Sequence, residues 1–339
     1  MRYRRRLHRR DAKKQKKIIV FSLFAALLCL SISYAAFSTN INLTAKGNVY
    51  KVSDKCYRTS DNGDGTVTIT DYDKSCGTEV NIPSTIKGLT VTKIGDNSFQ
   101  NKGITKLTLP DTLLEIGVFA FHLNKIETLT LPDNLKTVKA YAFRLNSIQK
   151  LNLNDGLEEI GLDAFDSNYL TEIKIPSSVT KLGGGAFAKN NLKGDAAFIY
   201  GINSDGSTNY SVLNSYAGKD ATGTFIPDTV TVIQTEAYVN VHYEEITIPG
   251  RIKEIDGYTF YNSEAKKITI EEGVEEISSY AFSKSNITSI NLPSTIKTLG
   301  YAFSDTPTLK KINICKKENT IEGTPWGATN ATVNWIGTN

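Results

Sequence analysis

The chain has 339 residues, 40% hydrophobic and 22% charged, so it can bury a sizeable core and is neither collagen-like nor disordered in bulk. The net charge of +4 is unevenly spread: residues 1–17 hold ten Lys or Arg and one Asp, a net +9, and the other 29 basic and 34 acidic residues give residues 18–339 a net −5. A mildly acidic main body argues against nucleic acid as a partner, because phosphate binding needs a basic face.

An uncharged apolar segment, IIVFSLFAALLCLSISYAAF, follows the basic head at residues 18–37. Its length suits either a membrane-spanning helix or the apolar region of a secretory signal, and the basic residues before it would keep the N-terminus inside. Ser33 and Ala35 stand where a signal peptidase requires small residues, for cleavage before Ala36. Both alternatives export the rest of the chain, either as a single-pass cell-surface protein or as a secreted one.

Residues 38–81 are predicted to form a linker and an N-terminal cap with a β-hairpin. The stretch DNGDGT at residues 61–66 is typical of a hairpin turn, because Gly after Asn or Asp is the strongest hairpin signal. A calcium loop is the alternative, but it would need Ser60 as the first ligand and Asp71 where a bidentate Glu belongs. Cys56 and Cys76 flank the hairpin, and in an exported segment we expect them to form a disulfide.

A 22-residue repeat begins at residues 104, 126, 148 and 170, and again at 221, 243, 265 and 287. Apolar residues alternate at positions 4 and 6, which predicts a strand with one buried face, and Pro at position 7 ends that strand in six copies. Positions 10 and 13 are aliphatic, and an Ala–Phe pair such as Ala120–Phe121 stands at positions 17 and 18. Such a unit cannot bury its apolar side alone, so we expect stacked coils joined by a ladder of parallel strands.

Two further repeat positions predict corner geometry. Gly at position 14 would supply a tight bend where a side chain would crowd the next coil. Asn at position 21 would turn its amide inward to satisfy buried backbone groups, with an exposed binding row as the alternative. The residues concerned are Gly117, Gly161, Gly183 and Gly300, and Asn124, Asn146, Asn168 and Asn190.

The consensus LxxLxLPxxLxxIGxxAFxxN, present as LTLPDTLLEIGVFAF at residues 107–121 and as ITIPGRIKEIDGYTF at 246–260, resembles the BspA-like leucine-rich repeats of bacterial cell surfaces. The resemblance covers about residues 79–335. It implies a mainly β leucine-rich repeat solenoid with blocks at residues 82–191 and 221–314, preceded here by one N-terminal membrane-spanning or signal helix. Some members of that family are adhesins, so the resemblance implies binding without catalysis or a cofactor, and it carries no site residue onto this chain.

Two segments depart from the repeat. Residues 192–220 form a predicted island with a hairpin at Asn203–Gly206, which serves either recognition or the sealing of an interrupted core by its aromatic residues. Residues 315–339 are predicted to form a C-terminal cap that uses Trp326 and Trp335 to cover the last coil. No anchor motif or second apolar span follows, so we expect any attachment to be through the N-terminus.

Enzyme chemistry lacks its usual components in this sequence. The three histidines, His8, His122 and His242, cannot converge in a rigid stack, and no hydrolase, zinc or phosphate-loop motif occurs. Carboxylate pairs such as Glu158–Glu159 stand at outward positions, where a solvated face explains them. A glycan-active enzyme would need two carboxylates at working distance in a cleft near the island.

The outward positions 3 and 5 of the strand ladder, with two tyrosines of the island, are the predicted binding surface for an extracellular protein or a cell-wall glycan. A merely solvated face is the alternative, because the ladder positions carry no aromatic anchor. The two functional hypotheses are therefore a protein-binding or adhesion module and a structural spacer of the cell envelope without a specific ligand. The surface residues are Lys106, Thr108, Thr128, Thr130, Lys150, Asn152, Glu172, Lys174, Tyr200 and Tyr210.

Overall fold

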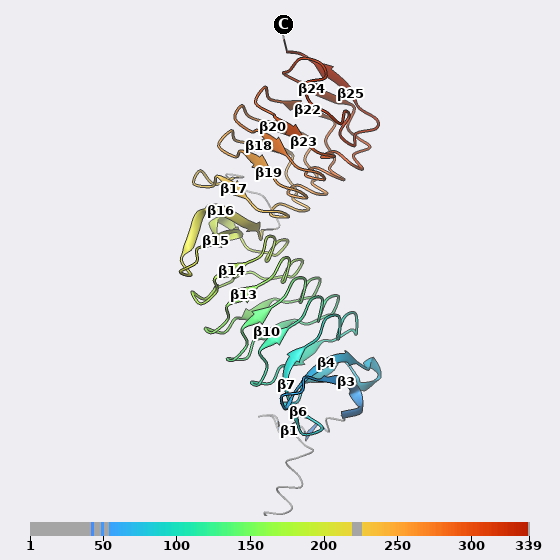
Figure 1. Cartoon of the computed structure of the whole chain (residues 1–339), viewed down its shortest axis with the longest axis vertical. Coiled ribbons are helices and arrows are strands. Elements are labelled where there is room, and N and C mark those ends of the chain that lie inside the picture. Colours follow the sequence, from blue (N-terminus) through green and yellow to red (C-terminus); the bar gives the residue numbers. More distant parts are fainter. Residues whose placement is uncertain (1–41, 44–48, 51–53, 219–225, 338–339) are drawn as a thin grey trace, which may run out of the picture. The chain divides into compact units, whose positions relative to one another are not determined.

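The structure, a computed structural model, describes residues 42–43, 49–50, 54–218 and 226–337 (Figure 1). The chain divides into two compact units, Met1–Asp54 and Lys55–Asn339. In the first unit, β1 (Asn42–Leu43) pairs antiparallel with β2 (Val49–Tyr50). Within the described ranges no helix has the length and apolarity that a membrane span requires. The predicted span at 18–37, the basic head before it and the cleavage site after Ala35 lie outside those ranges.

The second unit is a mainly β solenoid whose coils follow the 22-residue repeat (Figure 1). Each regular coil carries one short strand near repeat positions 3 to 6 and a second at positions 12 and 13. Strands of successive coils pair in parallel with an offset of one repeat, as Thr128 does with Lys150. The first set of strands is β5 (Glu79–Asn81), β8 (Lys106–Thr108), β10 (Thr128–Thr130), β12 (Lys150–Asn152), β18 (Glu245–Ile248), β20 (Lys267–Ile270), β22 (Ser289–Leu292) and β24 (Lys311–Ile314).

The first ladder is interrupted within the first block. Strands β5 and β8 pair, β10 and β12 pair, and β18 to β24 form a separate sheet, but no ladder joins β8 to β10 among the described strands. Glu172 and Lys174, predicted to lie on a strand, are outside any strand because the island rather than another coil follows theirs. The inward residues Leu107 of β8 and Leu151 of β12 are half-buried, whereas Leu129 of β10 is fully buried.

A second ladder, which the sequence analysis did not predict, lies at positions 12 and 13. In the first block it runs without interruption from the N-terminal cap to the coil at residue 170, in the order β4, β7, β9, β11, β13, β14. Its strands are β4 (Thr66–Tyr72), β7 (Leu89–Ile94), β9 (Glu115–Ile116), β11 (Thr137–Val138), β13 (Glu159–Ile160) and β14 (Lys181–Leu182), and in the second block β17 (Val232–Ile233), β19 (Glu254–Ile255), β21 (Glu276–Ile277) and β23 (Thr298–Leu299).

The aromatic residue at position 18 forms the centre of the core. Within each block the rings of neighbouring coils stack face to face, with centroids between 4.9 and 5.8 Å apart. Every one of these side chains is fully buried, so each coil removes one whole aromatic side chain from water. The stacked residues are Phe99, Phe121, Phe143, Phe165 and Phe187, then Tyr238, Phe260, Phe282 and Phe303.

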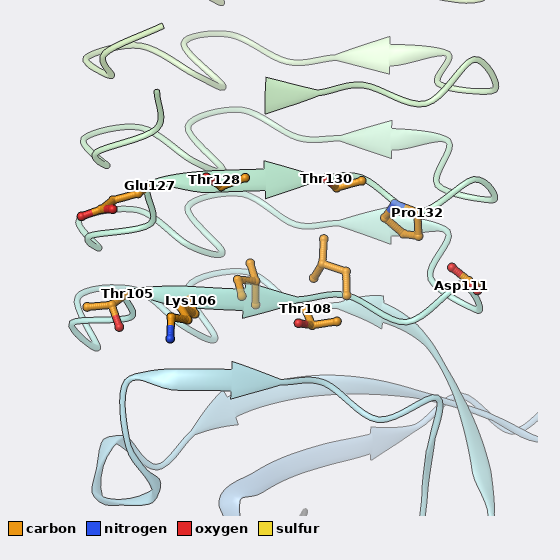
Figure 2. Close-up of a pocket in the computed structure, with 10 residues that line it drawn as sticks. Thr105, Lys106, Thr108, Asp111, Glu127, Thr128, Thr130 and Pro132 are labelled. Atoms are coloured by element: carbon orange, nitrogen blue, oxygen red, sulfur yellow. The ribbon is translucent and has the colours of Figure 1, made fainter. Parts of the chain in front are cut away.

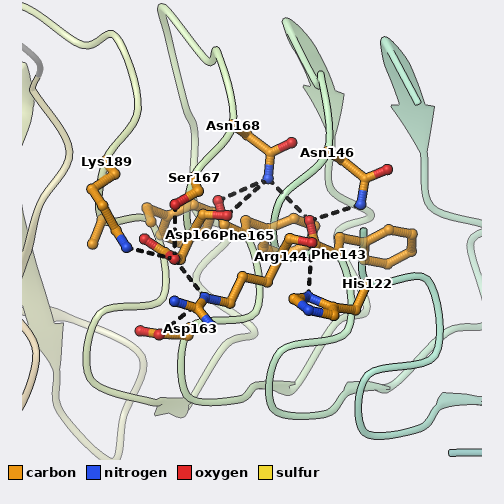
Figure 3. Close-up of polar contacts among 12 residues, drawn as sticks. His122, Phe143, Arg144, Asn146, Asp163, Phe165, Asp166, Ser167, Asn168 and Lys189 are labelled. Carbon is orange, nitrogen blue, oxygen red and sulfur yellow. Dashed lines mark hydrogen bonds and ion pairs between the residues drawn. The ribbon is translucent and has the colours of Figure 1, made fainter. Parts of the chain in front are cut away.

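The predicted corner role of Asn at position 21 is confirmed (Figure 3). The Nδ2 of Asn146 donates to the carbonyl of Phe121 in the preceding coil at 2.9 Å and to that of Phe143 in its own coil at 3.1 Å. Its Oδ1 accepts from the amide of Ile126 at 3.2 Å. One side chain therefore satisfies three backbone groups and joins two coils. In the second block Ser263, Ser285 and Thr306 occupy this position.

Glycine at position 14 is also confirmed as a close-packing requirement. A Cβ on Gly161 would overlap the backbone of Ala140 in the preceding coil, and one on Gly300 would lie 2.6 Å from the Ser279 hydroxyl. Positions 16 and 20 add two left-handed turns to most coils, with φ of 54° at Phe119 and 57° at Leu123. These turns fold residues 117–123 into the tight corner that closes the coil.

The island carries the expected antiparallel hairpin, formed by β15 (Phe198–Ile202) and β16 (Thr208–Tyr216). Its second strand also pairs in parallel with β17, so it occupies the place of a coil strand. Tyr216 is buried and stacks on Tyr238 with centroids 5.8 Å apart. The island therefore extends the core across the interruption, as the sealing alternative requires.

Both ends of the solenoid are covered. At the N-terminal end β3 (Tyr57–Asp61) pairs antiparallel with β4, and β6 (Thr85–Ile86) pairs with β7. At the other end β25 (Thr332–Trp335) adds one more parallel strand to β24, and Trp326 is buried against it with its ring 6.0 Å from that of Trp335. The segments η1 (Asp54–Cys56), η2 (Lys74–Cys76) and η3 (Gly194–Ala197) are single 3-10 turns.

The Asn network predicts a specific stability loss. Replacing Asn146 by Ala would leave two buried carbonyls and one buried amide without their hydrogen-bond partners. We therefore expect Asn146→Ala to lower the free energy of unfolding by about 3 kcal/mol in urea denaturation. The exposed Asn134, whose Nδ2 bonds only to the Asp111 carbonyl, supplies the control, and Asn134→Ala should cost less than about 1 kcal/mol. Equal losses for the two variants would contradict the role assigned to the buried amides.

Candidate functional site

The break between β8 and β10 opens a groove of about 560 Å³ on the strand face (Figure 2). It is floored by Leu107 and Leu109, and its rim is polar. Four threonine hydroxyls, one ammonium and two carboxylates surround it. The polar lining residues are Thr105, Lys106, Thr108, Asp111, Glu127, Thr128 and Thr130.

The main chain of both strands faces this groove. The amide of Lys106 donates to the Thr78 carbonyl, which turns the backbone of Lys106 toward β5. Because successive residues of a strand point their peptide groups to opposite sides, the peptide groups of Leu107 point toward β10. The amide of Leu131 bonds to the Asn152 carbonyl, so the peptide groups of Leu131 point toward β12. By the same alternation, the peptide groups of Thr128 and Thr130 point toward β8. The groove therefore presents peptide donors and acceptors along two facing edges.

Four of the predicted surface residues lie together in this groove: Lys106, Thr108, Thr128 and Thr130. Lys106 is held at the rim by an ion pair with Glu79, 2.7 Å between Nζ and Oε1. Lys150 and Asn152 lie on the adjoining strand β12, where the Asn152 amide donates to the Thr130 hydroxyl at 3.0 Å.

The other predicted residues are elsewhere. Glu172 and Lys174 lie beyond β12 on a segment without strand pairing. Tyr200 and Tyr210 form a ring pair on the island hairpin with centroids 5.0 Å apart, and Tyr210 is largely exposed. The structure therefore divides the ten predicted residues between a groove, a neighbouring strand and a separate hairpin.

A row of exposed tyrosines at the corner of the second block was missed by the sequence analysis. Tyr258 and Tyr280 occupy position 16 of successive coils and stack with centroids 5.1 Å apart, and Tyr301 continues the row. Beside them the Lys284 ammonium lies 5.3 Å from the centre of the Tyr261 ring. The recurrence of Tyr at position 16 was the available signal. In the second block, the exposed tyrosines of the described residues therefore lie at the corner of the coils.

The histidines of the solenoid are separate from the groove and from each other. His122 is mostly buried, and its Nδ1 contacts the Arg144 carbonyl at 3.1 Å. Burial, together with the nearby Arg144 charge, lowers the pKa of His122 below its ordinary value. His242 pairs with Glu264 at 2.9 Å on the exposed surface.

The DNGDGT stretch forms a hairpin turn. The Asp61 carboxylate accepts from the amide of Gly63, and that of Asp64 accepts from the amide and hydroxyl of Thr66. These bonds to the turn lower the pKa of Asp64. In the part of the chain that the structure describes, no cluster of three or more His, Cys, Asp or Glu has a geometry suited to a metal ion.

Cys56 and Cys76 are joined by a disulfide that closes the base of the cap. The bridge links η1, which precedes β3, to η2, which follows β4, so it encloses the hairpin. Cys315 is exposed and unpaired in the structure.

The sequence profile of the family described as "BspA type Leucine rich repeat region (6 copies)" matches residues 70–193 and 213–327. A comparison with curated proteins found no match.

Solved structures with a similar fold come from several bacteria. A leucine-rich repeat protein from Eubacterium ventriosum shares 22% identity, with 87% of this chain and 77% of that one covered and a TM-score of 0.53. The pneumococcal vaccine antigen PcpA shares 17% identity over 84% and 86% of the two chains, with a TM-score of 0.50. A leucine-rich cell-surface protein from Faecalibacterium prausnitzii shares 21% identity over 87% and 97%, with a TM-score of 0.47.

The disulfide predicts both a thiol count and a stability effect. In residues 38–339, denatured without reductant, we expect one reactive thiol, Cys315, and three after reduction. Replacing Cys56 and Cys76 by Ser should lower the free energy of unfolding of the cap by about 3 kcal/mol, because the closed loop restricts the unfolded chain. Three reactive thiols before reduction would show that the bridge does not form.

Proposed function

This chain belongs to the BspA-type leucine-rich repeat family, and from that premise we propose that it is an exported binding protein that holds an extracellular protein in the groove between β8 and β10. The proposal includes no catalytic step. It takes the N-terminal segment 18–37 as the membrane span or secretory signal, so that the solenoid is either displayed on the cell surface or released after cleavage near Ala35.

The observation that carries the proposal is the break in the strand ladder. A regular solenoid pairs the peptide groups of each coil with those of its neighbours and offers a partner only side chains. At the groove, in contrast, two strand edges face each other without a ladder between them. A partner that lies along the open face of the groove can bond to the peptide groups of these edges with its own polar groups.

The side chains around the groove suit the same ligand. Thr108, Thr128 and Thr130 each offer a hydroxyl that both donates and accepts, and Leu107 and Leu109 provide an apolar floor for a peptide side chain. Lys106 on one side and Glu127 on the other place opposite charges at one end, which would orient a bound segment.

Export is supported by the disulfide at the cap. A bridge between Cys56 and Cys76 persists in oxidising compartments and is rare in the cytosol. The cap therefore belongs on the outer side of the membrane, in agreement with a basic head that keeps the N-terminus inside.

A blocking substitution tests the groove. We expect Thr108→Arg to weaken binding of residues 38–339 to the protein partner at least tenfold, because a long cationic side chain would fill the groove. The same substitution at Thr269, which holds the same repeat position on β20 in the closed ladder, is the matched control and should leave binding unchanged.

The measurement is saturable binding of the immobilised protein to a panel of extracellular matrix proteins and cell-wall glycans, with circular dichroism to show that both variants fold. If the protein binds a glycan and Thr108→Arg abolishes that binding, the groove would remain the binding site, but its ligand would be a glycan and not a protein. A structural spacer of the envelope predicts no saturable binding to any member of the panel.

A further inference from the structure

Repeat position 16 changes its chemical character around the island. It is Asn97 in the first coil and aromatic in the next two coils and in two coils of the second block, but in the three coils nearest the island it is Asp163, Gly185 and Glu236. These eight residues share the left-handed corner geometry, with φ between 50° and 65°, so they occupy equivalent places in their coils. The aromatic members are Phe119, Tyr141, Tyr258 and Tyr280.

Gly185 allows the two acidic side chains to meet. A Cβ on Gly185 would overlap Oδ1 of Asp163 and lie 3.4 Å from the Cβ of Glu236, so no larger residue fits between them. Oδ1 of Asp163 is buried and has no hydrogen-bond donor among the described residues, and the Glu236 side chain lies close enough for a hydrogen bond between the two carboxyl groups to raise the pKa of Asp163. Asp163 is only 2% exposed, whereas Glu236 is half-buried.

A hydrogen bond between two carboxyl groups requires a proton on one of them, because two carboxylates in contact repel each other. Burial favours Asp163 as the group that carries it. Burial, the hydrogen bond to Glu236, and the negative charges of Asp166 and Glu236 together raise the pKa of Asp163 to about 9, although Arg144 opposes the shift.

Two cations complete the cluster (Figure 3). Arg144 Nε lies 2.7 Å from Asp166 Oδ2 and 3.6 Å from Asp163 Oδ2, and Lys189 Nζ lies 3.0 Å from Asp166 Oδ2. Asp166 is completely buried, and Arg144 and Lys189 are its ion-pair partners.

The remaining titratable groups on this side are Tyr141 and His122. The Arg144 guanidinium lies over the Tyr141 ring at 5.7 Å, and His122 contacts the Arg144 carbonyl. With Asp163 protonated, the two cations offset the charges of Asp166 and Glu236. Ionisation of Asp163 would leave one excess negative charge among buried groups.

We propose that Asp163 and Glu236 form a proton-held clasp that fastens the coil beginning at residue 148 to the first coil after the island, so that loss of the shared proton loosens the junction around the hairpin. The backbone next to the clasp joins the same parts of the chain. The Gly185 amide donates to the Asn214 carbonyl of β16 at 3.0 Å, and the Asn214 amide side chain donates to the Gly183 carbonyl at 2.7 Å.

The sign of the pH effect follows from the proton count. The folded protein holds a proton on Asp163 that the unfolded chain releases above its ordinary pKa of 3.8. The stabilisation is therefore fully present below about pH 4 and is lost as the pH rises toward about 9, where the folded carboxyl also ionises. Between those values this one group reduces the folding equilibrium constant by up to about tenfold per pH unit.

The experiment measures unfolding midpoints of residues 38–339 from pH 5 to pH 10 for the wild type, Asp163→Asn and the control Asp155→Asn, whose side chain is exposed in the same coil. The Asn side chain can donate to Glu236 without taking up a proton from solution. The unfolding midpoint of Asp163→Asn should therefore lack the part of the wild-type stability that decreases as the pH rises, and it should exceed the wild-type midpoint at pH 9.5. The control should run parallel to the wild type. Parallel curves for all three proteins would overturn the clasp.

A second measurement does not depend on the variant folding. Infrared spectra of the wild type at pH 7 should show a buried protonated carboxyl band that disappears near pH 9. Hydrogen exchange at the Gly185 and Tyr216 amides should accelerate more than tenfold, beyond the intrinsic pH effect, over the same pH range, while exchange at Phe121 should not. The absence of the carboxyl band at pH 7, or uniform exchange along the solenoid, would refute the proposal.

Discussion

The structure depends on one constraint: a coil of 22 residues is too thin to enclose its own apolar side chains. Each coil buries them only against its neighbours, so the coils must stack in register. Two side chains maintain that register in the first block. The phenylalanine at position 18 stacks on the equivalent ring, and the asparagine at position 21 bonds to carbonyls of two coils, as Asn146 does. The aromatic stack buries apolar surface between coils, and the amide side chain forms hydrogen bonds with the buried backbone groups at the same corner.

A regular stack has little chemistry to offer, because its peptide groups already bond to the neighbouring coils. The features that can act on something else lie where the repeat is interrupted. The groove lies where β8 and β10 fail to pair, and the carboxyl pair lies where the island replaces a coil. At the groove these groups are peptide groups that a regular coil would pair in a ladder, and at the carboxyl pair they are two acidic side chains that a regular coil would keep apart. In both places the regular coils on either side hold the groups in position. A solenoid can tolerate such local departures because each coil contacts mainly its neighbours.

Most of the architecture could be predicted from the sequence because it depends on residue identities that recur. The period of 22, the buried Phe, the inward Asn and the crowded Gly each appear several times, and each has a single physical explanation. The groove could not be predicted in this way. Lys106 and Thr108 at the break have the same character as Lys267 and Thr269 in the closed ladder, so residue type does not distinguish a paired strand from an unpaired one. To predict the carboxyl pair, one would have to know that residues 163 and 236, which are 73 positions apart, meet across Gly185.

The groove and the clasp lie in different coils, and each coil contacts mainly its neighbours, so the two sites are structurally separate. The groove is formed by the coils that begin at residues 104 and 126, and the clasp is centred on Asp163 in the coil that begins at 148. Arg144 is the closest connection, because it belongs to the coil of β10 and pairs with Asp163 and Asp166. However, Arg144 lies at the corner of that coil, and the strand face of the groove is separated from it by the fully buried Phe143 and Leu129 of the same coil. A change in the charge of Asp163 therefore acts on the corner of the stack and on the island, while the peptide edges of the groove keep their positions.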